Sequence, residues 1–267
     1  MLKSVEVSRG LAPADVGPNA LAGSIAYETK DASDLLEEGD NFGGMLSLRV
    51  GDNDDFLRGG LTVFGRSGWF EYLLSATGTD GDDYEDGAGQ VVDGTRADLT
   101  NYIGKLAYTL QSGHRFEFAA SQTEDTGARA GQIGPGGIIF VRPDFEGVVG
   151  APSVFVEALS QRTSYMFTYS IEVAQGWLDP TVQLSYNEQK VDVSGVVGTN
   201  ESFSGTIKNH FQIAEGTLTV GLDFFDESAS GFGRGPGPFD SSGKKEHRNI
   251  GIFTQARQDI GERVSVT

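Results

Sequence analysis

The chain is 267 residues long and carries 20 basic residues against 38 acidic residues, which gives a formal net charge of −18. This charge excludes nucleic acid as a partner bound through a basic surface, because binding to phosphates needs an excess of Lys and Arg. The sequence contains no cysteine, so disulfides, thiolate metal sites and cysteine nucleophiles are excluded as well.

Residues 1–38 differ in residue pattern from the rest of the chain. They begin with an alternating segment, Lys3–Gly10, and continue with a stretch rich in small residues that reaches Leu36. The start lacks the long apolar core of a signal peptide, so we expect any export signal to be missing from this sequence. A transmembrane helix is excluded because no stretch reaches about 18 consecutive apolar residues.

From residue 39 onward, apolar and polar residues alternate with period two in many short segments. This period is typical of β-strands that have one apolar face. In the segment that follows Trp69, one face carries Phe70, Tyr72, Leu74 and Ala76. The same pattern marks residues 101–111, 116–120, 164–173, 181–187 and 218–224. We expect about eleven strands in total, the last of which is cut off at Thr267.

The connectors between these segments alternate between short and long. The short connectors, each with a glycine suited to a tight hairpin, are residues 66–68, 111–113, 174–176, 214–216 and 259–262. The long connectors are residues 80–97, 125–160, 194–200 and 229–246. The hairpin near residues 51–55 is the one exception, because it is short but belongs to the long series. Short turns at one end and long loops at the other are typical of outer-membrane β-barrels.

The polar face of the strands separates a membrane barrel from a soluble one. It carries Glu71, Lys105, Gln183 and Asn187, which is too polar a set for a dry core. The apolar face is therefore expected to contact outer-membrane lipid, and the polar face to line a lumen. Both tryptophans, Trp69 and Trp177, follow short turns, as an interfacial aromatic girdle requires.

The first 40 residues resemble the end of the plug domain in TonB-dependent outer-membrane receptors. The segment Val5-Glu6-Val7-Ser8-Arg9-Gly10 is similar to a plug strand of that family, and residues 17–30 are similar to the segment that follows it. Residues 31–36, Asp-Ala-Ser-Asp-Leu-Leu, resemble the haem and haemoglobin receptor branch. Residues 251–255, Gly-Ile-Phe-Thr-Gln, look like a barrel strand frequent in these receptors.

The resemblance implies an all-β fold in which a plug sits inside a 22-stranded barrel. It divides the chain into 1–38, the C-terminal end of a plug domain, and 39–267, the N-terminal part of a partial antiparallel transmembrane β-barrel. It implies uptake of haem, a haem protein or a ferric siderophore, driven through the TonB system. Most of the plug, the TonB box and the second half of the barrel are expected to lie outside this sequence. A non-transporting surface protein, either an adhesin or a porin-like channel, is the alternative.

Few side chains suggest site chemistry. His247, beside a long outside loop, is the one candidate ligand for haem iron, whereas His114 and His210 lie next to short turns. The acidic loop at residues 80–86 lacks the EF-hand pattern, so we expect no metal site there. We expect no cofactor and no enzymatic activity, because a nucleophile, a base and an orienting partner do not occur together. The connector at 125–160 is expected to contact ligand or to close the vestibule.

Overall fold

The structure is a computed structural model, and it describes residues 1–9, 23–134, 137–140, 154–174, 177–193, 196–213, 216–231, 244–260 and 264–266. The described residues form a small two-stranded sheet and a large antiparallel sheet. The small sheet pairs β1 (Leu2–Arg9) with β2 (Gly23–Thr29), and one 3-10 turn, η2 (Ala32–Asp34), follows it. Part of the plug-like motif, residues 10–22, lies outside the described residues.

The large sheet follows the chain order as an antiparallel meander. Its first strands are β3 (Phe42–Val50), β4 (Leu57–Ser67), β5 (Phe70–Gly81), β6 (Ala97–Thr109) and β7 (His114–Gly134). It continues with β9 (Val154–Ile171), β10 (Pro180–Val193), β11 (Val196–Ile213), β12 (Gly216–Gly231), β13 (Lys245–Ile260) and β14 (Val264–Val266). The short strand β8 (Gly137–Phe140) pairs with β7 to one side of this path. The eleven described strands of the path agree with the number that the sequence predicts.

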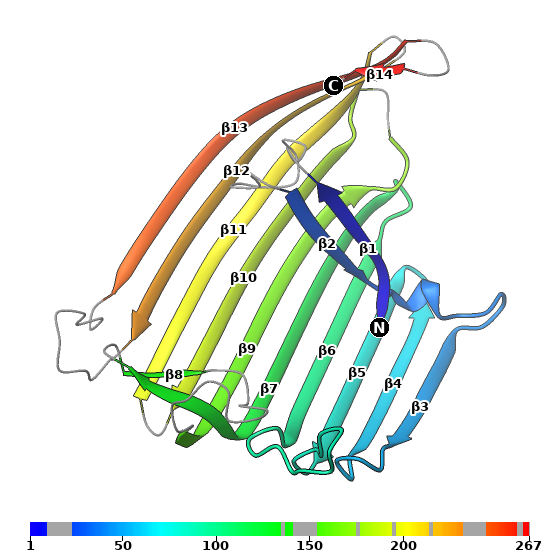
Figure 1. Ribbon diagram of the computed structural model, residues 1–267. Helices are drawn as coiled ribbons and strands as arrows, with labels where there is room; N and C mark the ends of the chain where they lie inside the picture. The colour runs from blue at the N-terminus through cyan, green and yellow to red at the C-terminus, as the bar shows by residue number, and fades with distance from the viewer. Residues whose placement is uncertain are drawn as a thin grey trace.

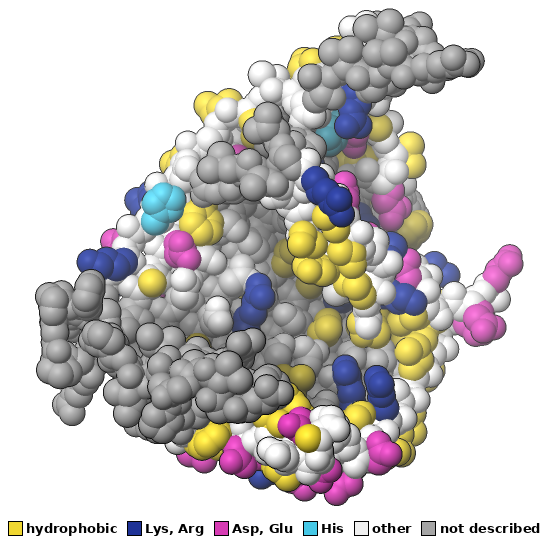
Figure 2. All heavy atoms as spheres, viewed as in Figure 1, with side chains coloured by type: hydrophobic (Ala, Val, Ile, Leu, Met, Phe, Trp, Pro, Cys, Tyr) yellow, Lys and Arg dark blue, Asp and Glu magenta, His cyan; other side chains and the backbone are white. Residues whose placement is uncertain are grey.

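The large sheet curves into an open half-barrel, and β1 and β2 cross in front of its concave face (Figure 1). Figure 2 shows a group of hydrophobic side chains over β1 and β2, where Val5, Val7, Ile25 and Tyr27 are exposed. Among the described residues, no helix is long and apolar enough to cross a membrane.

The two faces of the sheet have the polarity that the period predicts. On β6, Leu106 is 42% exposed on the convex face, whereas the neighbouring Lys105 and Ala107 are only 7% and 6% exposed on the concave face. Trp69 and Trp177 are exposed at the end of the sheet with the short turns, and Trp177 stacks on Phe211 with ring centroids 6.5 Å apart. The apolar face therefore points outward, with aromatic rings at its border.

Two of the predicted short turns, residues 66–68 and 111–113, lie fully within the described residues and follow the prediction, whereas residues 175–176, 214–215 and 261–262 of the other three lie outside the described residues. Gly113, between β6 and β7, has φ +81°, a left-handed conformation that favours glycine. Its N–H donates to the carbonyl of Leu110 at 2.9 Å, and its own carbonyl accepts from the N–H of Glu172 at 2.8 Å. The turn is thus held both to its own strand and to the end of β9.

Two of the predicted long connectors are shorter in the structure. Strands β7 and β9 extend into the predicted connector at 125–160 from its two ends. They stay paired from Asp125 opposite Ser160 to Gly131 opposite Val154. The connector at 194–200 is mostly strand, since Asn200 pairs with Gln189. Residues 125–131 and 198–202 are polar or small on both faces, so the period of two is lost in them while the backbone ladder continues. Residues 141–153 lie outside the described residues.

Candidate functional site

The end of the small sheet is fastened to the concave wall by a group of charged side chains, which we call the anchor: Asp31, Glu71, Lys105, Arg115 and Glu117. Lys105 reaches from β6 and forms a close ion pair with the carboxylate of Asp31. Its ammonium also donates to the carbonyl of Thr29 at 3.2 Å and to the carbonyl of Lys30 at 3.5 Å. Lys105 therefore holds three consecutive residues, the last residue of β2 and the two that follow it.

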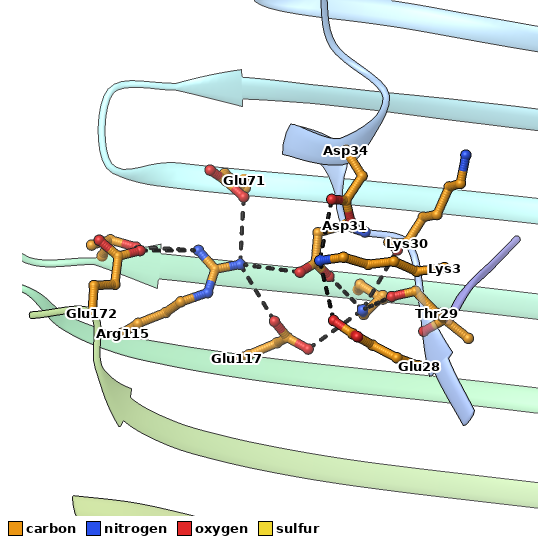
Figure 3. Close-up of polar contacts among 12 residues, drawn as sticks. Lys3, Glu28, Thr29, Lys30, Asp31, Asp34, Glu71, Arg115, Glu117 and Glu172 are labelled. Carbon is orange, nitrogen blue, oxygen red and sulfur yellow. Dashed lines mark hydrogen bonds and ion pairs between the residues drawn. The ribbon is translucent and has the colours of Figure 1, made fainter. Parts of the chain in front are cut away.

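Arg115 on β7 occupies the other side of the same carboxylate (Figure 3). Its guanidinium lies 3.8 Å from Asp31, 3.5 Å from Glu71 and 3.4 Å from Glu117, measured between nitrogen and oxygen atoms. Lys105 reaches Glu117 as well, at 3.5 Å. Each cation thus contacts at least two carboxylates, and such a shared arrangement offsets part of the cost of removing charges from water.

The ladder of the barrel wall explains how these side chains meet. Glu71, Ala107 and Glu117 are direct cross-strand partners on β5, β6 and β7, so they form one row on the concave face. The small side chain of Ala107 leaves space between the two carboxylates. Asp31 enters from the side of the small sheet into a small pocket lined by all five residues of the anchor. The sequence places the wall residues on one face but gives no sign of Asp31 as their partner.

An apolar contact lies beside the anchor. Ala32, in η2, packs with Phe64 and Leu73 of the wall, and Leu73 is the most buried large side chain of the described residues. Met1, Leu35 and Leu36 pack around this group. The small sheet and the wall are thus joined by charge and by hydrophobic burial at the same end of β2.

A second ion cluster braces the small sheet itself. Lys3 on β1 lies 3.1 Å from Glu28 and 3.2 Å from Asp34. Hydrogen bonds from Lys3 and Ser4 lower the pKa of Glu28 below its ordinary value. Burial alone would raise the pKa of Asp34, but the backbone N–H of Asp31 and the Lys3 ammonium lower it.

His247, the ligand candidate from the sequence, lies on the concave face of β13. Direct cross-strand partners point to the same face of a sheet, so a row of such partners from β5 to β13 shows which face His247 is on. The row consists of Ser75, Ile103, Ser121, Ser164, Asn187, Ser202, Glu227 and His247. The imidazole is exposed, and its ring centroid lies 6.0 Å from that of Phe225. Its direct cross-strand partner Glu227 accepts a hydrogen bond from Asn200 at 2.8 Å.

The other two histidines already have partners near the short turns. His114 contacts the hydroxyl of Tyr169 at 2.8 Å, and its ring stacks on that tyrosine. His210 contacts the hydroxyl of Thr219, also at 2.8 Å. Of the three histidines, His247 is therefore the one that stands exposed on the lumen side of the wall.

The acidic loop between β5 and β6 uses its carboxylates to hold its own backbone. Asp83 accepts from the N–H groups of Thr95 and Arg96 at 2.6 and 2.7 Å. Asp86 accepts from the N–H groups of residues 88 and 90 at 2.8 and 2.9 Å. These bonds give the carboxylates a structural role at the long-loop end of the wall.

No protein-family model matches the chain. Among curated proteins, it is 29% identical over its whole length to the haem transporter BhuA of Brucella ovis, of which it covers 39%. It is 40% identical over 76 residues to transferrin-binding protein A of Neisseria meningitidis, which is 28% of this chain and 8% of that protein. The chain thus spans about two fifths of the length of the haem transporters that it matches.

Solved structures show the same fold. The FrpB iron transporter of Neisseria meningitidis gives a TM-score of 0.80 at 20% identity, over 98% of this chain and 45% of FrpB. The haemophore receptor HasR of Serratia marcescens, solved with its haemophore HasA and haem, gives 0.72 at 18% identity over 96% of this chain and 37% of HasR. The chain therefore shares the barrel fold of these transporter and receptor structures over nearly its whole length. The proteins that it resembles are transporters and receptors.

Proposed function

We propose that this chain supplies the end of the plug and the first part of the barrel in an outer-membrane receptor that imports haem or a ferric siderophore. The similarity to a haem transporter along the entire chain carries this proposal. The polar concave wall and the plug-like sheet held against it support the same reading. Import in this scheme uses energy delivered by the TonB system, and the chain has no catalytic role.

The division between plug and barrel at residues 38 and 39 is part of this proposal. The positions of the elements along the chain support this division, because η2 ends at Asp34 and the first strand of the large sheet, β3, begins at Phe42. The anchor lies on the plug side of this boundary. A pull on β1 and β2 would therefore be resisted at Asp31 before it reached the barrel strands.

We further propose that His247 binds haem iron. A neutral imidazole nitrogen is a common protein ligand of haem iron. The exposed position of His247 on the lumen side makes its ring accessible, and the nearby ring of Phe225 offers an apolar contact for a porphyrin edge. Glu227, opposite His247 in the ladder, is placed to fix the orientation of the imidazole.

Binding measurements on the complete protein that contains this chain test both proposals. We expect tight binding of haem or a ferric siderophore. For haem, we expect His247→Ala to weaken binding at least tenfold and to shift the haem absorption band. His210→Ala is the matched control, since His210 already contacts Thr219, and it should bind haem normally.

The two proposals fail in different ways. Unchanged haem binding in His247→Ala would remove His247 as the ligand but leave the receptor in place. A complete protein that binds neither haem nor any ferric siderophore would instead remove the receptor function. It would favour the alternative of an adhesin or a porin-like channel, and these two differ in whether the protein conducts ions.

A further inference from the structure

A depression of about 530 Å³ lies on the convex face of the sheet. The anchor and the lumen are on the other, concave face. It arises where small residues replace large ones in a cross-strand row. Leu74, Gly104, Ala120 and Tyr165 are successive partners on β5, β6, β7 and β9. The two small residues lie side by side between two large ones, so the surface dips at Gly104 and Ala120.

The walls of the depression are apolar, and one of them is braced. Leu61, Leu74 and Tyr102 project on one side, and each is about half exposed. On the other side, Tyr165 stacks between Phe118 and Tyr186, with ring centroids 6.3 Å away in each case. A wall held by stacked rings keeps its shape, so the depression is a formed groove.

The chemistry of the groove changes towards its rim. None of the described residues that line it is charged. Gln122 and Thr163 close it on the side of the long loops, and one step further Gln161 donates to Glu124 at 2.9 Å. On the side of the short turns, the convex face stays apolar as far as Phe116. The groove therefore lies at the outer edge of the apolar band, next to a rim of amide, hydroxyl and carboxylate groups.

We propose that this groove binds one acyl chain of a glycolipid from the outer leaflet of the membrane. Hydrocarbon on this face meets the fixed depression, and a chain lying in it gains dispersion contacts that a flat wall does not offer. The rim suits the sugar part of such a lipid, because amide, hydroxyl and carboxylate groups hydrogen-bond to hydroxyls. None of the described lining residues is charged, so the groove itself suits hydrocarbon, and any preference for a sugar headgroup comes from the rim.

Gly104→Leu fills the groove with little strain. A Cβ atom built on Gly104 would lie 3.4 Å from Leu74 Cδ2, an ordinary contact, so a larger side chain would extend into the depression. Gly59→Leu is the matched control, because Gly59 lies on the same convex face and a Cβ there would meet nothing within 4 Å. Both changes add the same side chain, and only one of them fills the groove.

The assay is native mass spectrometry of the complete protein that contains this chain, extracted from outer membranes and washed with detergent. Glycolipid should remain on the wild type and on Gly59→Leu, and Gly104→Leu should retain at least fivefold less. Ala120→Leu should repeat the loss if Gly104→Leu fails to fold. Equal retention in all variants, equal loss in both glycine variants, or retention of phospholipid alone would overturn the proposal.

Discussion

Breaking the ion pair between Lys105 and Asp31 is the most informative perturbation of the anchor. In Lys105→Met, the methylene stem is largely kept, while the ammonium that contacts Asp31 and the carbonyls of Thr29 and Lys30 is lost. Removal of one partner from a buried ion pair costs about 3–5 kcal/mol. Because Arg115 still lies 3.8 Å from Asp31, we take the lower end, about 3 kcal/mol, which is about 150-fold in an equilibrium constant.

Hydrogen–deuterium exchange of the complete protein measures this effect, since local opening of a segment sets the exchange rate of its amides. Peptides that cover β2 and η2 should exchange about 150-fold faster in Lys105→Met, by the estimate above. Arg248→Met is the control: it breaks the exposed pair between Arg248 and Asp226, which should cost less than about 1 kcal/mol.

A double-mutant cycle with Asp31→Asn makes the test stricter. If Lys105 and Asp31 act together, the double variant should open little more than the Lys105→Met variant, because each change already removes the shared interaction. Unchanged exchange of β2 and η2 in Lys105→Met, together with normal folding of the barrel, would refute the reasoning. The small sheet would then be held to the wall by the apolar contact alone.

Three further predictions address the lipid face, pH and conductance. Phe118→Lys should lower barrel stability in lipid by about 2–4 kcal/mol, whereas Ser121→Lys on the lumen side should not, in urea titrations. Because the folded-state pKa values of Glu28 and Asp34 are lowered, their stabilisation is present above about pH 4 and is lost as pH falls further, so exchange of β1 and β2 should then rise. In planar bilayers the complete protein should conduct little, and Lys105→Met should conduct more.

The strands were predictable from the sequence wherever one face is apolar and the other is polar. The segments around Phe70, Tyr102 and Tyr165 show this alternation, and each lies in a strand of the large sheet. The prediction stopped short at the long-loop ends, because the residues around Asp125 and Asn200 are polar or small on both faces. Backbone pairing continues there without any signal in the side-chain pattern.

The anchor was less accessible to sequence reasoning. The alternation placed Glu71 and Lys105 on the polar face, and the structure confirms that position. The partner Asp31 is 74 residues away from Lys105 in the sequence. It lies on a segment whose residue pattern does not indicate which part of the barrel it contacts. Only the three-dimensional path of the chain after β2 brings Asp31 to the wall, so this contact appears in the structure alone.

Spin labels on β7 test most directly which face of the sheet meets hydrocarbon. The 267-residue sequence contains no cysteine, so within it each introduced cysteine is a unique attachment site. With labels placed one at a time at Phe118, Ala119, Ala120 and Ser121, we expect residues 118 and 120 to be accessible to oxygen dissolved in lipid. Labels at 119 and 121 should be shielded from it. High oxygen accessibility at 119 and 121 with low accessibility at 118 and 120 would contradict the account.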